Sequence, residues 1–584
     1  MNRRTFLKAA AVGGTSLFFS LQCRGRRRGP ANVLLILADD MGWGDLSLHG
    51  NSLLSTPNID RLAREGAEFE RFYASPNCPA TRASLLTGRH SLKTGVYGIT
   101  RGEETMRSSE VTLAEILRQN RCATGCFGKW HNGAHYPQDP NGQGFKEFIG
   151  FCQGHLNNYF DPILLHNGRE IRTSGYITHF LTDQAIRFIE HNRKRPFFCY
   201  LAYNVPHSPF QVPDAYFEKF KALGLDDEAA CIYGMCENLD DEIGRILRRL
   251  DELDLARETY VIFLSDNGPN TERYNAGMRG IKGSPYEGGS RVPCFIRRPG
   301  KIQAGLKLQP PAAHYDLLPT LIDLLDLPQP NTLPLDGISF APLLLGRNES
   351  LPKRMLFDYW PPYGSVRTER HHLIIGFDHL ELYDILKDPQ ETQNIAANEP
   401  ATTEFLFAAY EEWREAVTQN GLEPIPVEIG HRCRAKVVLP AHEAHLFPEN
   451  GVGIRFAGGA GLANDYISCW TSLKAYAEWP IVVLRGGVYQ VSIDYRCGTG
   501  GIGVEFFIEI FRQRLTGAIR QAFSPPPLPS PDRVPRREVY EYQWQRLCLG
   551  KVRLTAGRTY VRLRLLRLPN AEAMEVKAVC IERC

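Results

Sequence analysis

The stretch ANVLLILADD, residues 31–40, determines the fold class that we expect. Its first eight residues are almost all apolar, and two aspartates follow directly. An apolar run of this length predicts a strand that is buried on both faces of a largely parallel sheet. The stretches PFFCYLA, residues 196–202, and TYVIFLS, residues 259–265, have the same character and predict two more strands of this sheet.

Helical periodicity alternates with these strands, in residues 58–66, 112–119, 176–191, 231–253 and 315–325. Such alternation predicts an α/β domain, with helices flanking the sheet and ligands bound at the carboxyl ends of the strands. From about residue 432 onward, apolar and polar residues alternate instead, in 488–495, 503–510 and 560–566. This period of two predicts an antiparallel β-sandwich.

The predicted organisation has three parts, namely an export signal over 1–28, an α/β domain over 29–430 with a smaller subdomain near 350–430, and a β-sandwich accessory module over 431–584. A proline-rich stretch inside this module, residues 524–535, predicts a stiff loop. Carbohydrate binding is one interpretation of the module, because an exposed Trp470 or Trp479 could stack on a sugar ring. The alternative is that both tryptophans belong to the core of the sandwich.

The first residues have the character of an export signal. They read MNRRTFLKAAAVGGTSLFFSL, with Arg3 and Arg4 before an apolar run that is too short for a comfortable membrane span. This pattern predicts recognition by the Tat export machinery and an exported protein, periplasmic or at the cell surface. Cys23 is a candidate for lipidation, and a lipid anchor there is the only membrane contact that we expect.

The formal net charge of +3 comes from this leader. The leader has seven of the 68 basic residues and no acidic residue, so 61 basic residues face 65 acidic residues in the rest, a balance of −4. This balance indicates no nucleic-acid partner. The fifteen cysteines are scattered and odd in number, which does not indicate a disulfide framework.

Polar side chains follow two of the predicted strands. Asp39 and Asp40 come after the first strand, and Asp266 and Asn267 come after TYVIFLS. One such pair is more often a helix cap or a solvated turn, but two pairs at the same edge of a sheet favour a binding site. Three carboxylates and an amide oxygen suit a hard divalent cation, Ca²⁺ ahead of Mg²⁺, and argue against zinc.

Cationic and titratable side chains occur in several short motifs. Lys129 and His131 lie in GKWHNG, His207 lies between prolines in PHSP, and Lys282 lies in RGIKGSPYEGG. If the first motif is extended, Lys129 and His131 point to the same side. Each residue alone is more often structural, but together with Arg82 and a divalent cation they suit the binding of a compact tetrahedral anion.

The stretch SPNCPATRASLLTGRH, residues 75–90, carries a cysteine directly before a proline. A free cysteine is most often a small buried apolar residue. Here Pro79 suits the start of a helix, which would place Cys78 at a helix N-terminus, where negative charge is favoured. Arg82 would lie one turn further on, within reach of an oxyanion at residue 78.

Together these motifs resemble the type I, formylglycine-dependent sulfatases of the alkaline phosphatase superfamily, and the chain is arylsulfatase-like. The matching stretches run in the order of that family over about residues 31–400, and they include NVLLILADDMGWGDLSLHG, CPATRASLLTGRH, GCFGKWHNG, YNVPHSPF, LSDNGPN and RGIKGSPYEGGSRVPCFIRRPG. Two positions depart from the common pattern. Ala80 replaces a proline, a form that also occurs in the family, and Asn132 replaces a leucine.

The resemblance implies that a separate maturation enzyme oxidises Cys78 to formylglycine (3-oxoalanine). The hydrate of this aldehyde would attack sulfur, form a covalent sulfo-enzyme intermediate and later release inorganic sulfate. The cation would be held by Asp39, Asp40, Asp266 and Asn267.

The resemblance also implies roles for the other motif residues. Arg82 and Lys129 would help to ionise the nucleophilic hydroxyl, and Lys282 would neutralise the sulfuryl oxygens. His207 would protonate the leaving alcohol, and His131 would take the proton from the second hydroxyl of the hydrate.

The sequence therefore predicts a hydrolase of sulfate esters whose substrate is a sulfated carbohydrate or an aryl sulfate. Two alternatives stay open. One is a phosphonate or phosphate monoester hydrolase of the same superfamily. The other is a catalytically silent protein that binds sulfated glycans.

Overall fold

The computed structural model describes residues 29–347, 351–419 and 421–584. The predicted export signal and Cys23 lie outside the described residues. Among the described helices, none is both long and apolar enough to span a bilayer. All cysteines within the described ranges are free thiols.

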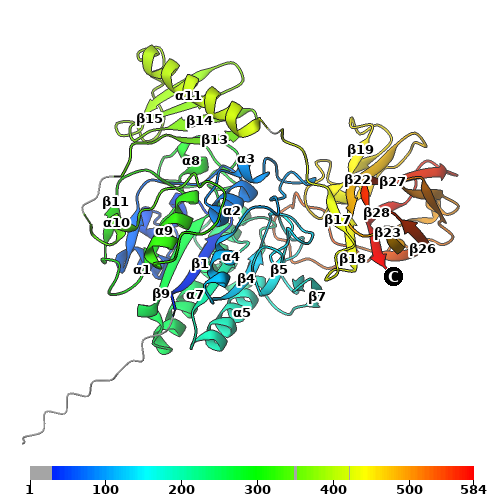
Figure 1. Ribbon diagram of the computed structural model, residues 1–584, viewed down its shortest axis with the longest axis horizontal. Coiled ribbons are helices and arrows are strands. Elements are labelled where there is room, and N and C mark those ends of the chain that lie inside the picture. Colours follow the sequence, from blue (N-terminus) through cyan, green and yellow to red (C-terminus); the bar gives the residue numbers. More distant parts are fainter. Residues whose placement is uncertain (1–28, 348–350, 420) are drawn as a thin grey trace, which may run out of the picture.

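A ten-stranded sheet forms the centre of the α/β part (Figure 1). Across the sheet its strands are β11 (Leu306–Leu308), β2 (Ala67–Phe69), β10 (Cys294–Arg297), β9 (Thr259–Ser265), β1 (Asn32–Ala38), β8 (Phe197–Ala202), β4 (Ala123–Lys129), β5 (Glu147–Phe151), β6 (Ile163–His166) and β7 (Arg169–Arg172). The five strands from β9 to β5 are mutually parallel, whereas β10, β6 and β7 pair antiparallel at the flanks. The prediction of a largely parallel central sheet is confirmed.

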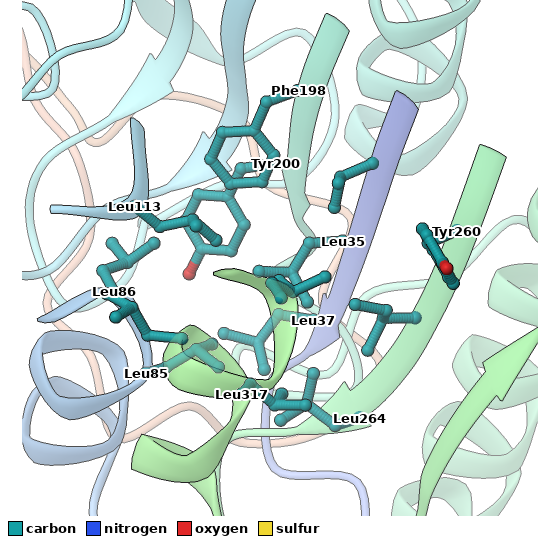
Figure 2. Close-up of a cluster of buried hydrophobic side chains, with 14 of the residues drawn as sticks. Leu35, Leu37, Leu85, Leu86, Leu113, Phe198, Tyr200, Tyr260, Leu264 and Leu317 are labelled. Carbon is teal, nitrogen blue, oxygen red and sulfur yellow. The ribbon is translucent and has the colours of Figure 1, made fainter. Parts of the chain in front are cut away.

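Alternate residues of β1 pack into different apolar cores. Val33, Leu35 and Leu37 lie in one core, and Leu34 and Ile36 lie in the other. Figure 2 shows the first core, where Leu35 and Leu37 point toward leucines of the covering helices. The strand is therefore buried on both faces, which is why its sequence is apolar without alternation.

Helices cover both faces of the sheet. The first core is covered by α2 (Cys78–Thr87), α4 (Leu113–Gln119), α9 (Leu317–Leu324) and α10 (Ala341–Leu344). The second core is covered by α1 (Pro57–Arg64), α5 (Ile177–Asn192), α6 (Asp214–Lys221) and α7 (Asp227–Glu252). Shorter elements are β3 (Phe72–Tyr73), β12 (Ala312–Ala313), α3 (Ser91–Thr94) and α8 (Glu287–Ser290). The predicted helices are present, with ends shifted by a few residues.

A smaller four-stranded antiparallel sheet follows in the chain. It consists of β13 (Leu356–Trp360), β14 (Tyr363–Arg367), β15 (His371–Ile375) and β16 (Leu380–Asp384), and α11 (Pro400–Thr418) packs on it. It has an apolar core of its own, and Figure 1 shows it beside the α/β part.

The C-terminal part consists of two six-stranded sheets packed over one apolar core. One sheet contains β17 (Val427–Ile429), β22 (Tyr476–Val483), β27 (Gly557–Arg567), β24 (Glu505–Ile510), β25 (Gln513–Ala518) and β19 (His445–Phe447). The other contains β20 (Arg455–Phe456), β21 (Ile467–Ser468), β28 (Glu575–Arg583), β23 (Gly487–Arg496), β26 (Gln545–Leu554) and β18 (Lys436–Pro440). Apart from the parallel pair β17 and β22, the strands pair antiparallel, as predicted.

The two tryptophans of this sandwich are core residues. Trp470 and Trp479 are 1% and 0% exposed, and their indole N–H groups donate to the carbonyls of Ser472 and Pro440. The idea that they stack on sugar rings at the surface is therefore wrong. The core alternative holds, because a large buried aromatic side chain contributes strongly to the packing of a sandwich.

A buried acidic group lies where the sandwich packs on the α/β part. Glu104 is 8% exposed, and its Oε2 has no hydrogen-bond partner among the described residues. Burial and the nearby carboxylate of Glu443 raise the pKa of Glu104 to about 8. Glu443 itself accepts a hydrogen bond from His135 Nε2 at 2.7 Å across this contact.

This raised pKa makes the free energy of unfolding depend on pH. Between pH of about 4.5 and 8, the unfolded chain loses the proton of Glu104 while the folded chain keeps it, so stability falls as pH rises through this window. A Glu104→Gln variant has no titratable group at this position, so its free energy of unfolding should not show this fall. We expect it to match the wild type at pH 4, below the window, and to exceed it by roughly 3–5 kcal/mol at pH 9, since one pKa unit corresponds to about 1.4 kcal/mol. Melting temperatures at both pH values measure the difference.

Glu449 supplies the control for this experiment, because it is an exposed glutamate of the sandwich, six residues after Glu443. A Glu449→Gln variant should show the pH dependence of the wild type. If Glu104→Gln shows it as well, the interpretation of Glu104 is wrong.

Candidate active site

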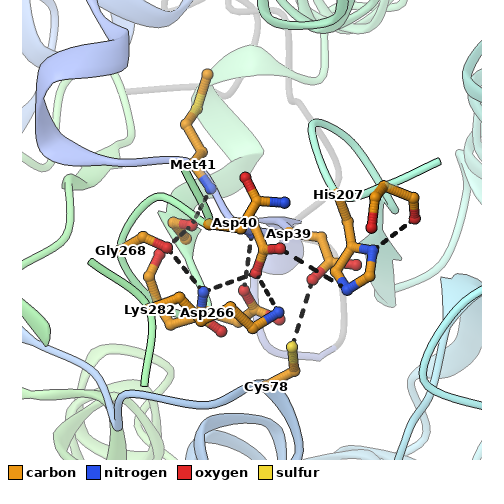
Figure 3. Close-up of polar contacts among 12 residues, drawn as sticks. Asp39, Asp40, Met41, Cys78, His207, Asp266, Gly268 and Lys282 are labelled. Atoms are coloured by element: carbon orange, nitrogen blue, oxygen red, sulfur yellow. Dashed lines mark hydrogen bonds and ion pairs between the residues drawn. The ribbon is translucent and has the colours of Figure 1, made fainter. Parts of the chain in front are cut away.

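The ends of two neighbouring strands bring four oxygen-bearing side chains together. β1 and β9 are parallel and paired along their whole length, so the residues that follow them are adjacent. Asp39 and Asp40 follow β1, Asp266 and Asn267 follow β9, and all four are fully buried. Figure 3 shows the three aspartates close together. The backbone N–H of Asp40 donates to Asp266 Oδ1 at 3.2 Å and joins the two strand ends. The structure thus places the predicted cation ligands in one cluster.

Two lysines neutralise the aspartates that follow β1. Lys129 Nζ donates to both oxygens of Asp39 at 2.8 and 3.0 Å, and Lys282 Nζ donates to Asp40 Oδ1 at 2.6 Å. Burial alone would raise the pKa of Asp40, but the charges of Lys282, His207 and Lys129 lower it below its ordinary value. The carboxylate therefore stays ionised in its buried position.

Arg82 pairs with the third carboxylate of the cluster. Its Nε and Nη2 donate to Asp266 Oδ2 at 3.0 and 2.7 Å, and its Nη1 donates to the carbonyl of Lys129 at 2.9 Å. The guanidinium is fully buried, and its Nη2 lies 3.7 Å from Asp39 Oδ1. These contacts orient Asp266 and tie α2 to the ends of β4 and β9, while the predicted contact of Arg82 with an oxyanion stays a prediction.

The cluster fits a hard cation. Asp40 Oδ2 and Asn267 Oδ1 are buried without a hydrogen-bond partner, although buried acceptors normally have one. Two unsatisfied oxygens beside the carboxylates of Asp39 and Asp266 form the set of oxygen ligands that Ca²⁺ and Mg²⁺ prefer. Candidate ligand atoms of Asp39, Asp40, Cys78 and His207 also lie within 4.8 Å of one another, so the cation and the reacting residue would be neighbours.

Cys78 begins helix α2 and points toward this cluster (Figure 3). Asn77 caps the helix by accepting a hydrogen bond from the N–H of Ala80 at 3.2 Å, and Pro79 follows Cys78 in the first turn. The Cys78 Sγ lies 3.6 Å from Asp39 Oδ1. Burial and the carboxylate of Asp266 raise the pKa of the Cys78 thiol to about 12. An unmodified thiol at this place is therefore protonated at neutral pH.

His207 lies on the other side of Asp40. Its Nδ1 is hydrogen-bonded to the carbonyl of Ser208 at 2.6 Å, and its Nε2 lies 3.7 Å from Asp40 Oδ2. Burial lowers the pKa of His207 to about 4, despite the opposing effect of Asp40. With Nδ1 committed to a carbonyl, Nε2 is the atom that can exchange a proton.

His131 occupies a different position from the one that we predicted. β4 ends at Lys129, and His131 has a φ of 58°, so the expectation of one extended segment through both residues is wrong. His131 Nε2 is hydrogen-bonded to the carbonyl of Ile99 at 3.0 Å, and its Nδ1 is buried without a partner. The strand end nevertheless brings Lys129 to Asp39, while the turn brings His131 to the same cavity as Cys78.

A cavity of about 370 Å³ opens over these residues. Its wall includes Asp40, Cys78, His131, His207 and Lys282. Sequence reasoning missed other residues of the wall, namely His155, Arg536, Arg537 and Glu538. His155 lies in GFKEFIGFCQGHLNNYFDP, residues 144–162, a stretch of weaker resemblance to the sulfatases, and no role was predicted for it. The other three come from the C-terminal part of the chain and lie in none of the motifs.

The fold and the site suit one class of protein, a hydrolase of anionic esters, because an acidic cluster that could hold a cation lies beside Cys78 at the start of a helix. Comparison with known proteins agrees with this class. Arylsulfatase A of Homo sapiens is 32% identical over 454 residues, covering 65% of this chain and 86% of that protein. N-acetylgalactosamine-6-sulfatase of Canis lupus familiaris is 32% identical over 373 residues, covering 56% of this chain and 68% of that protein.

A solved structure, Ps i-CgsB in complex with k-i-k-neocarrahexaose, superimposes with a TM-score of 0.62 at 29% identity and covers 66% of this chain and 92% of its own. The model of the sulfatase family matches residues 31–327, and a model described as the C-terminal part of N-sulphoglucosamine sulphohydrolase matches residues 282–415. The chain belongs to the sulfatase family, within the alkaline phosphatase superfamily. It is an enzyme that hydrolyses sulfate esters, which confirms the predicted fold class, family and reaction.

Proposed function

We propose that this sulfatase removes sulfate from a sulfated carbohydrate, with formylglycine at position 78 and Ca²⁺ at the acidic cluster. One observation carries the proposal. The first residue of α2, Cys78, lies in one cavity with His131, His207 and Lys282, beside a buried cluster in which Asp40 Oδ2 and Asn267 Oδ1 lack hydrogen-bond partners. Formylglycine supplies a hydrate with two hydroxyls, one to attack sulfur and one to let the sulfate be expelled.

The metal would be held by Asp39, Asp40, Asp266 and Asn267. When bound, Ca²⁺ supplies positive charge that lowers the cost of ionising a hydroxyl and of binding sulfuryl oxygens. Ca²⁺ is preferred over Mg²⁺ because the site offers several protein oxygens, whereas Mg²⁺ usually keeps most of its water ligands.

The chain's own side chains have separate tasks in this proposal. Lys129 fixes Asp39 next to residue 78, and Lys282 places a positive charge in the cavity for the sulfuryl oxygens. His207 Nε2 gives a proton to the leaving alcohol. Because burial lowers the pKa of His207 to about 4 in the free protein, this role requires the negative charge of the bound sulfate ester to raise that pKa. His131 takes the proton of the second hydroxyl, and its unpartnered Nδ1 is the atom free to do so.

The names of two relatives support a carbohydrate substrate. One relative is an N-acetylgalactosamine-6-sulfatase, and one solved structure holds a neocarrahexaose. The cavity of about 370 Å³ is large enough for a small sugar and continues over the sandwich loops.

We also propose export of the enzyme to the periplasm or cell surface through the Tat machinery. Recovery of the protein only from the cytoplasmic fraction would contradict this.

The experiment that tests the proposal is mass spectrometry of the tryptic peptide over residues 72–82, from protein purified out of the exported fraction of its host. We expect residue 78 to have lost its sulfur and gained an aldehyde. An intact Cys78 in this protein would contradict the mechanism and favour a silent glycan-binding protein.

The relative rates with sulfate and phosphate esters distinguish a sulfatase from a phosphatase. The converted enzyme should hydrolyse an aryl sulfate faster than the corresponding aryl phosphate. Faster cleavage of the phosphate would support the alternative of a phosphonate or phosphate monoester hydrolase as the main activity.

Removal of the metal gives a further prediction. Dialysis against a chelator should abolish activity, because Asp40, Asp39 and Asp266 then bind only the neighbouring cations. Re-addition of Ca²⁺ should restore activity and raise the melting temperature, since a ligand bound only by the folded state stabilises it. Full activity in the chelator would contradict the metal site, and better recovery with Mg²⁺ would contradict the choice of ion.

A further inference from the structure

The C-terminal sandwich forms part of the wall of the active-site cavity. Its residues there come from the loop between β20 and β21 and the loop between β25 and β26, and they are Leu462, Ala463, Val534, Arg536, Arg537 and Glu538. The α/β part contributes Cys78, His207 and Lys282 to the wall of the same cavity. A substrate that fills this cavity therefore contacts both parts of the chain.

The second of these loops is fixed to the α/β part by hydrogen bonds. Gln211 Nε2 donates to Ser530 Oγ at 2.8 Å and to Asp532 Oδ1 at 2.7 Å. Arg536 Nη1 donates to the carbonyl of Asn157 at 2.8 Å, and its guanidinium also pairs with Asp532. Arg536 is thus committed to holding the loop in place, and the loop has a defined position in the cavity wall.

Glu538 is a buried carboxylate with one oxygen unused. It is 8% exposed, and its Oε1 accepts a hydrogen bond from the hydroxyl of Ser208, the neighbour of His207. Its Oε2 is buried and has no partner among the described residues. A buried acceptor without a donor is costly to keep, and in a cavity wall a hydroxyl of a ligand can satisfy it.

His155 presents a second unsatisfied group next to it. The residue is 6% exposed, and its Nε2 is buried without a partner. Its ring is nearly parallel to that of His207, with centroids 6.1 Å apart, and both rings line the cavity. Two residues with unpartnered polar atoms, His155 and Glu538, therefore lie close to His207, which we propose protonates the leaving alcohol.

Arg537 adds a positive charge that nothing in the described chain neutralises. It is exposed, it lines the cavity, and neither a hydrogen bond nor an ion pair holds its guanidinium within the described residues. Its neighbour Arg536, by contrast, is fully engaged. A free guanidinium binds a sulfate or carboxylate through two parallel hydrogen bonds.

Building on the proposed sulfatase function, we propose that Glu538, His155 and Arg537 form a recognition site for an acidic oligosaccharide. Glu538 accepts a hydrogen bond from a hydroxyl of the sugar that carries the scissile sulfate. Arg537 pairs with a second anionic group of the substrate, either a further sulfate or a carboxylate. The sandwich then determines substrate specificity at the active site itself, and the tryptophans buried in its core take no part.

Binding to a Cys78→Ala protein, loaded with Ca²⁺, tests this proposal without turnover. Three probes are titrated calorimetrically: an N-acetylgalactosamine 6-sulfate glycoside, its 4,6-disulfate, and a disaccharide in which a glucuronate adjoins the 6-sulfated sugar. We expect at least one of the two doubly charged probes to bind about 10- to 100-fold more tightly than the first, as expected for hydrogen bonds to charged groups. The tighter of the two identifies the second anion as sulfate or carboxylate.

Two further substitutions in the same protein locate the effect. Arg537→Ala should abolish the preference for the doubly charged probes, while Glu538→Gln should weaken all three probes about tenfold. Arg512→Ala is the matched control, because Arg512 is an exposed arginine of the sandwich that does not line the cavity. It should leave every affinity unchanged.

Equal affinity for the three probes, or no binding of the doubly charged ones, would overturn the proposal. So would an Arg537→Ala protein that keeps the preference. The proposed function is measured separately, by the chemical state of residue 78 and by turnover of an aryl sulfate in the wild type. Failure of one proposal can therefore be distinguished from failure of the other.

Discussion

Replacing Cys78 with alanine is expected to lower kcat for an aryl sulfate by about 10⁴- to 10⁶-fold, the range expected when a nucleophile is removed. Cys78 begins α2, lines the cavity and lies beside the acidic cluster, so it is in place to carry the nucleophile. Alanine cannot be converted to formylglycine, so neither hydroxyl of the hydrate would exist. Steady-state kinetics with a chromogenic sulfate ester measures the loss.

The fold should survive this change. Cys78 Sγ makes one long contact, 3.6 Å from Asp39 Oδ1, and the loss of a single buried sulfur costs about 1 kcal/mol. Cys294→Ala provides the matched control, because Cys294 is equally buried in β10 but lies in the apolar core. It should keep normal activity. If Cys78→Ala keeps a substantial fraction of the wild-type activity, the nucleophile is a different group.

A Cys78→Ser variant refines the same test. Serine has a single hydroxyl, so a sulfate ester formed on it would lack the second hydroxyl needed for expulsion. We expect at most one turnover, with alcohol released in an amount equal to the enzyme. The intact mass of the protein should then increase by one sulfuryl group. Sustained turnover with an unmodified serine would show that the second hydroxyl is not required.

Much of the fold could be predicted from the sequence because its central strands are buried on both faces. The apolar runs of β1, β8 and β9 have no competing helical period, and each predicted strand is present. β4 escaped prediction, because its sequence, ATGCFGK, contains two glycines and few β-branched residues. Gly128 there has a φ of 112°, and a Cβ at this position would lie 1.8 Å from the carbonyl oxygen of Ala202. The close packing of β4 against β8 therefore requires a glycine at position 128, although glycine weakens the sequence pattern of a strand.

Some features of the candidate site could likewise be predicted from the sequence, and others could not. Asp39 and Asp266 could be predicted as neighbours, because parallel strands end at one edge of the sheet. The position of His131 could not, since it depends on a turn with positive φ after β4. The proximity of Glu538 and His155 in the cavity could not be predicted either. They meet in one cavity only because the sandwich docks on the α/β part, and no local pattern encodes a contact between residues so far apart in the chain.

Replacement of His207 by glutamine is expected to have the second largest effect, and the size should depend on the leaving group. His207 is the histidine that we propose protonates the departing alcohol. Its Nδ1 is hydrogen-bonded to the Ser208 carbonyl, and its Nε2 lies 3.7 Å from Asp40 Oδ2. Removal of a general acid typically costs about 10²- to 10⁴-fold in rate. We expect this loss of kcat with a sugar sulfate, whose alkoxide is a poor leaving group.

With 4-nitrophenyl sulfate the same His207→Gln variant should lose far less of its kcat, because nitrophenolate departs without a proton.

A His131→Gln variant should behave differently from His207→Gln. The proposed task of His131 comes after the alcohol has left, so His131→Gln should slow the release of sulfate from the enzyme to the same extent with both substrates. A rapid-mixing experiment that follows alcohol release separates the two variants, with a burst in His131→Gln and none in His207→Gln on the sugar sulfate. Equal losses on both substrates for His207→Gln would show that His207 does not protonate the leaving group. His155, whose ring centroid lies 6.1 Å from that of His207, would then be the candidate for this role.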